Sequence, residues 1–146
     1  MDTKPYRMAV VVALVAAVLL LWVSQGVGII GADGDPANRM YFGVLAVGLI
    51  GAVLAWLRPR GMARALVATA VAQGAVTVVA LAGGMGRPWS GPLDLLLLNG
   101  FFIALFLVSA WLFRQAARDE EAARAKASAS EETEGGENTA GTSEPA

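Results

Sequence analysis

The segment that decides the fold reads LDLLLLNGFFIALFLVSAWLF and runs from Leu93 to Phe113. It carries a single charge, that of Asp94, at its second position. An α-helix rises about 1.5 Å per residue, so about 20 apolar residues match a hydrocarbon core of about 30 Å. This segment is therefore predicted to be a helix that crosses a membrane.

Three further apolar stretches of similar length precede it, at residues 8–30, 40–57 and 62–81. Hydrophobic residues make up 56% of the chain, and the charges lie almost entirely outside the four stretches. Short connections force consecutive helices to run in opposite directions. The chain is predicted to be all-α, with residues 8–113 forming a membrane-embedded antiparallel four-helix bundle of two helical hairpins. We expect Pro59 and Gly61 to interrupt the helices on either side of the second connection.

The first stretch follows a short basic segment, residues 1–7, and so also resembles the beginning of a secretory signal peptide. Its apolar run resumes after Ser24, Gln25 and Gly26 and reaches about 25 residues. No clear Ala-x-Ala cleavage site follows it. We therefore expect a retained helix.

Basic residues orient the predicted helices. Two of the 11 Lys and Arg residues, Arg39 and Arg87, fall in the first and third connections. The other nine fall before the first stretch, in the second connection or after the fourth stretch, on the opposite side of the membrane. The positive-inside rule then predicts that both termini lie in the cytoplasm. Tyr6, Trp56 and Trp111 at one set of ends, and Tyr41 and Trp89 at the other, are typical of side chains at the membrane surface.

The composition excludes many kinds of chemistry. The chain has no Cys and no His, which removes thiol chemistry and the commonest general base and metal ligand. Ser24 and Ser109 have no ionisable neighbour within their segments, so we expect no enzyme activity and no cofactor. A net charge of −1 gives no reason to expect nucleic-acid binding. Asp33, Asp35 and Asp94 are expected to cap helices and turns rather than to bind a metal ion.

The chain becomes polar after the fourth stretch. Residues 114–127 are rich in Ala and charged residues, which predicts a cytoplasmic helical extension. Residues 128–146 contain no large apolar side chain, and we expect a disordered acidic tail. The tail is interpreted as a solvating extension, with an acidic interaction segment as the alternative.

Five polar side chains within the apolar stretches are candidates for intramembrane contacts. Thr69, Gln73 and Thr77 are spaced by four and share one helix face. Gln25 and Asn99 are expected at about the depth of Thr77. Amides in hydrocarbon need partners, so we expect Gln25, Gln73, Thr77 and Asn99 to face the interior. Hydrogen bonds that join the helices are the favoured interpretation. A polar conduit is the alternative.

Three segments, residues 40–48, 58–66 and 98–102, resemble those of small four-helix bacterial membrane proteins to which no activity is assigned. The resemblance covers about residues 8–114 and implies a multi-pass protein of the bacterial inner (cytoplasmic) membrane. The chain is also similar in size to small multidrug transporters. Those proteins carry a Glu within the first membrane helix, and this chain has no Glu between Met8 and Ile30. Small four-helix fluoride channels are of similar size too, but their Gly-rich, Arg-containing motif is missing.

These observations favour a non-enzymatic protein that acts by association. The expected partners are the lipid bilayer and either a second copy or a membrane complex. The alternative is a small channel or facilitator for a neutral or weakly charged solute, with Gln25, Gln73, Thr77 and Asn99 along its path.

Overall fold

The computed structural model describes residues 3–26, 29–30, 36–85, 87–88 and 91–140, and the side chains among them as far as residue 136. These residues form four α-helices and one short 3-10 helix, with no β-strand among them. The all-α prediction is therefore confirmed. In chain order the elements are α1 (Lys4–Gly26), η1 (Pro36–Arg39), α2 (Met40–Leu54), α3 (Pro59–Ala82) and α4 (Pro92–Ala140).

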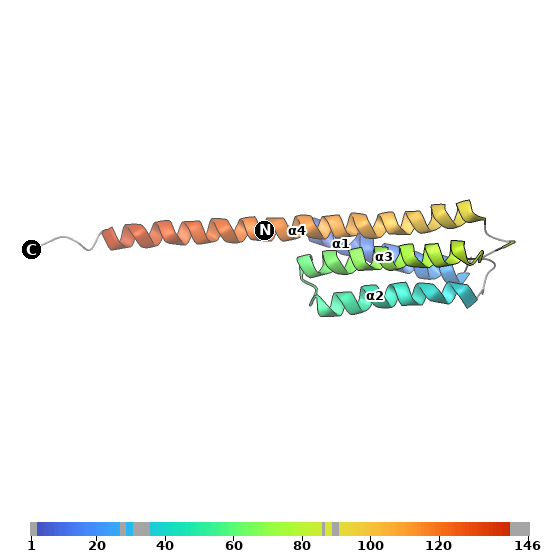
Figure 1. Ribbon diagram of the computed structural model, residues 1–146. Coiled ribbons are helices and arrows are strands. Elements are labelled where there is room, and N and C mark those ends of the chain that lie inside the picture. The colour runs from blue at the N-terminus through green and yellow to red at the C-terminus, as the bar shows by residue number, and fades with distance from the viewer. Residues whose placement is uncertain (1–2, 27–28, 31–35, 86, 89–90, 141–146) are drawn as a thin grey trace, which may run out of the picture.

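The four helices lie side by side, and α4 extends far beyond the other three (Figure 1). Both α1 and α3 pack along α4, and α2 packs on the side of α3. Contact between α1 and α2 is slight, so the bundle is open along that side. Helices α1, α3 and α4 are long and apolar enough to cross a membrane, and so is α2 together with η1, over Pro36–Leu54. This supports the assignment as a membrane protein.

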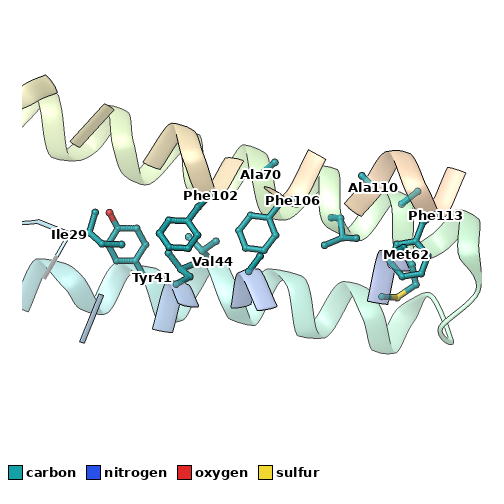
Figure 2. Packing of buried hydrophobic residues seen from close by; sticks show 14 of the residues in the cluster. Ile29, Tyr41, Val44, Met62, Ala70, Phe102, Phe106, Ala110 and Phe113 are labelled. Atoms are coloured by element: carbon teal, nitrogen blue, oxygen red, sulfur yellow. The ribbon is translucent and has the colours of Figure 1, made fainter. Parts of the chain in front are cut away.

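The buried face of α4 forms the centre of the core. Phe102, Phe106 and Phe113 point from α4 into the space between the helices (Figure 2). One series of buried positions along α4 alternates in spacing between four and three residues, as in the seam of a coiled coil, and Ala110 and Ala117 are buried beside it. The series is Leu95, Asn99, Phe102, Phe106, Ser109, Phe113 and Ala116.

The turn between α2 and α3 lies three residues earlier than the sequence predicts, at residues 55–58 rather than 58–61. Helix α2 ends at Leu54 rather than at residue 57, because Trp56 and Leu57 adopt left-handed backbone angles, with φ of 49° and 56°. That conformation costs roughly 1–2 kcal/mol for a residue with a side chain. The expectation that Pro59 and Gly61 interrupt α3 is wrong. Pro59 is the first residue of the helix, where its missing N–H loses no helical bond.

The first helix begins at Lys4 and ends at Gly26, not at Ile30. Ile29 and Ile30 are nevertheless buried, because the side chain of Asn38 holds their backbone. Its Oδ1 accepts the N–H groups of Ile29 and Ile30 at 3.0 and 2.9 Å, and its Nδ2 donates to Ile30 O at 3.0 Å. A side-chain amide thus replaces the hydrogen bonds that a continued helix would supply.

Helix α4 does not end at residue 127, as the prediction of a disordered tail over 128–146 requires. It continues to Ala140. Ser128, Ser130 and Thr133 donate their hydroxyls to carbonyls four residues earlier, at 3.1, 2.9 and 2.9 Å. This segment has no large apolar side chains to pack. Its helix contains these local bonds and several Ala residues, which have a high helix propensity. Residues 141–146 lie outside the described part of the chain.

Two glycines allow α2 and α3 to approach closely. A Cβ on Gly51 would lie 2.7 Å from Ala65 Cβ, and one on Gly61 would lie 2.6 Å from Ala55 Cβ. A real Cβ does not come so near another carbon. Both positions must therefore be glycine if the helices are to keep this separation.

Replacing Gly51 by Ala should destabilise the bundle by about 1–3 kcal/mol, because the added methyl group overlaps Ala65. Gly43→Ala is the matched control in the same helix, since a Cβ there meets nothing within 4 Å. The control should be neutral or should stabilise by up to about 1 kcal/mol. Denaturation of the chain in lipid–detergent micelles measures both changes. Equal stabilities of the two variants would contradict the close approach.

Candidate functional site

A buried polar cluster joins three of the four helices. Its centre is Asn99 of α4, whose Oδ1 accepts the Tyr41 hydroxyl of α2 at 3.0 Å and Nε2 of Gln73 on α3 at 2.8 Å. Asn99 Nδ2 donates to Leu95 O of its own helix, also at 2.8 Å. The three side chains are 0–1% exposed. The cluster therefore ties α2, α3 and α4 together at one depth.

The bond to Leu95 fixes how the two amides face each other. With Nδ2 of Asn99 directed at Leu95 O, Oδ1 is the atom presented to Tyr41 and Gln73. Gln73 must then offer its Nε2, since its oxygen would repel Oδ1. Its own Oε1 is left buried with no hydrogen-bond partner among the described residues. An unpaired buried acceptor of this kind costs about 1–3 kcal/mol.

Thr69 and Thr77 lie buried on the same face of α3 as Gln73, as their spacing predicts. Neither hydroxyl donates to another helix. Thr69 donates to Ala65 O at 2.8 Å, and Thr77 donates to Gln73 O at 2.9 Å. Threonine hydroxyls within a helix often bond in this way to the carbonyl four residues earlier. These two residues are therefore satisfied within α3, and Gln73 makes the contact between helices.

Gln25 does not join the cluster, contrary to the expectation that it faces the interior. Its side chain is exposed, and its amide nitrogen donates to the neighbouring Ser24 Oγ at 3.5 Å. Ser24 is the buried residue at this end of α1, and its hydroxyl donates to Leu21 O at 3.1 Å. Because these positions are adjacent in a helix, only one of them faces the core.

Two polar contacts are absent from the candidates that the sequence offers. The aromatic pattern places Tyr41 at the membrane surface, yet its ring is buried and its hydroxyl meets Asn99. Ser109 is also buried, and its hydroxyl donates to Ala9 O at 2.7 Å, which links α4 to α1. The four–three spacing that runs through Asn99 and Phe106 was the available signal for Ser109. No comparable signal identifies Tyr41, whose burial depends on how α2 sits against α4.

The cluster has little capacity for chemistry. Its members are two amides and a phenol, and it lies out of contact with solvent and lipid. Among the described residues there is no group of three or more His, Cys, Asp or Glu side chains suited to hold a metal ion. Asp94 accepts the N–H of Gly91 at 3.1 Å and so caps the start of α4. Asp33 and Asp35 lie outside the described residues.

Comparisons of the chain with protein-family models, with curated proteins and with solved structures find no match. The resemblance to small four-helix bacterial membrane proteins therefore stays a prediction.

The two amides of the cluster should respond unequally to apolar replacement. Asn99→Leu leaves both the Tyr41 hydroxyl and Gln73 Nε2 without their acceptor, so it should destabilise by about 2–4 kcal/mol. Gln73→Met removes the unpaired Oε1 along with one hydrogen bond, and Asn99 Oδ1 keeps the Tyr41 donor. We expect this variant to lie within about 1 kcal/mol of the parent chain.

Unfolding free energies of the two variants in micelles test this asymmetry. Tyr41→Phe is the control, because it removes one donor and orphans no group. It should cost about 0.6 kcal/mol, the average for one such bond between helices in a membrane. A cost for Gln73→Met equal to that of Asn99→Leu would contradict the hydrogen-bond geometry.

Proposed function

We propose that this chain is a multi-pass bacterial inner-membrane protein whose four helices cross the bilayer in an antiparallel bundle, with both termini in the cytoplasm. The helix lengths and compositions support the crossings. The end of α2 and the start of α3 lie at the same end of the molecule as the extension of α4 (Figure 1). Arg58, Arg60, Arg64 and Arg114 come from these segments, so the positive-inside rule favours this end for the cytoplasm.

The proposed role is non-enzymatic association, either with a second copy or with a membrane complex. This proposal rests on the burial of the polar cluster. Each of its three side chains is at most 1% exposed, and all of them bond to one another through Asn99. A conduit needs polar groups that face a path open to both sides of the membrane. The cluster instead has the properties of a structural joint.

A channel or facilitator for a neutral solute is the second candidate. The unpaired Oε1 of Gln73 favours it, because a solute with a donor group would satisfy that atom. The exposure of Gln25 counts against the path that the sequence predicts through this residue. The two proposals differ in whether a solute ever reaches the cluster.

Flux and size measurements on the full chain test the role. Liposomes containing the protein should pass small neutral solutes such as glycerol or urea no faster than protein-free liposomes. Native mass spectrometry from nanodiscs prepared directly from native membranes should show the 15.1 kDa chain within a larger assembly. Solute flux that is lost in both Gln73→Ala and Asn99→Ala would favour the channel. A lone monomer with no flux would contradict association.

The proposed topology has a separate test. A reporter that is active only in the periplasm should stay silent when fused after Ala146, because that end is expected in the cytoplasm. The same reporter placed in the α3–α4 connection, beside Arg87, is the positive control and should be active. Activity of the C-terminal fusion would overturn the orientation without affecting the bundle.

A further inference from the structure

An apolar groove of about 380 Å³ separates α1 from α2 on the open side of the bundle. Its volume falls within the range of small-molecule binding sites. The walls include Leu14 and Leu21 of α1 and Leu45 and Leu49 of α2, and Leu66 and Phe106 lie deeper, on α3 and α4. Leu14 and Leu49 are 60% and 68% exposed, so the groove opens to the surroundings along its length.

Such a groove cannot remain empty in a bilayer without loss of contact energy. An unfilled gap deprives its lining atoms of partners on one side. Water is a poor filler, because the walls offer it few hydrogen-bond partners. The surroundings of α1 and α2 in a bilayer are acyl chains, which match these walls in polarity.

On α3 the groove is lined only by residues of the half next to the α2–α3 turn, and on α1 it extends to Leu21. The turn belongs to the arginine-rich end of the bundle, which carries Arg58, Arg60 and Arg64. Ala52 and Met62, which line it, are within a few residues of the α2–α3 turn. An acyl chain seated there would belong to the leaflet on that side. The headgroup of the lipid would then lie beside the basic residues, and an anionic headgroup fits them best.

Arg7 is the basic side chain that shares a face with the groove. It precedes Leu14 and Leu21 at intervals of seven residues, so the three lie on nearly the same side of α1. Arg7 is exposed and about 10 Å from Leu14 along the helix axis. A lipid phosphate beside Arg7 would therefore lie on the same side of α1 as an acyl chain that enters the groove at Leu14.

Arg58 is at the same end but has a different setting. The Tyr6 hydroxyl donates to Leu57 O at 2.8 Å, which brings the start of α1 against the α2–α3 turn. Arg58, Asp119 and Glu120 border a separate hollow beside this contact. The two carboxylates offset the positive charge there, so Arg7 is the better site for an anion.

We propose that the groove between α1 and α2 binds one acyl chain of an anionic phospholipid from the leaflet at the arginine-rich end, with the lipid phosphate at Arg7. The proposal requires that the helices cross a bilayer. It does not require association with other proteins.

Photo-labelling of the full chain tests the groove. The probe is phosphatidylglycerol with a diazirine on one acyl chain, present as a minor component of phosphatidylcholine vesicles. Labelled peptides should concentrate on the groove walls around Leu14 and Leu49, and this map needs no variant. Ala52→Leu fills the groove and should lower that labelling about tenfold. Ala46→Leu, on an exposed face of the same helix, should leave it unchanged.

The headgroup has its own test. Arg7→Gln should reduce the preference for phosphatidylglycerol over phosphatidylcholine about fivefold. Arg64→Gln, an exposed arginine at the same end that borders a hollow between α3 and α4, is the control and should keep the preference.

Two results would overturn the proposal. Label spread evenly over all exposed apolar faces would show embedding without a lipid site. An unlabelled groove in which Leu14→Cys forms a disulfide-linked dimer would identify a second copy as the occupant. The parent chain has no cysteine, so any such link is unambiguous.

Discussion

The packing of α1 and α3 along the buried face of α4 is the interaction on which the rest of the molecule depends. Large aromatic side chains at Phe102, Phe106 and Phe113 fill the space between the helices, while small residues such as Ala9 and Ala70 let the neighbouring backbones come near. Helix α2 is held by two specific contacts, the close approach of Gly51 to α3 and the hydrogen bond from Tyr41 to Asn99 on α4. This dependence explains why the α1–α2 side stays open, since nothing requires these two helices to touch.

The two halves of the bundle are completed by different means. In the half that holds the start of α4, amide side chains satisfy buried polar groups. Asn38 bonds to the backbone of Ile29 and Ile30, and Asn99 accepts the side-chain donors of Tyr41 and Gln73. In the half near the α2–α3 turn, the helices are also joined by hydrogen bonds, from Ser109 to Ala9 O and from Tyr6 to Leu57 O, but these bonds go to backbone carbonyls. The groove between α1 and α2 reaches into this half, and its walls are mainly apolar.

The four helices could be predicted from the sequence because charge-free runs of membrane length are a signal of composition, which no tertiary contact alters. The face shared by Thr69, Gln73 and Thr77 followed from spacing alone. The exact ends could not be predicted, because they depend on contacts between distant residues. Asn38 buries Ile29 and Ile30 without a helix, and Trp56 and Leu57 turn the chain so that α2 ends three residues earlier than their apolar character implies. The partners of Asn99 and the exposure of Gln25 depend on how each helix is rotated, which hydropathy does not report.

The length of α4 has a mechanical consequence. The helix leaves the bundle near Glu121, which pairs with Arg60 of α3, and then runs to Ala140 with no proline after its first residue. About 28 Å of helix beyond Glu121 therefore moves with the part inside the bundle. A change in tilt of about 10°, within the range that bilayer thickness imposes on spanning helices, would carry the far end sideways by about 5 Å. The extension therefore acts as a lever, and the position of its free end depends on the tilt of α4 in its surroundings.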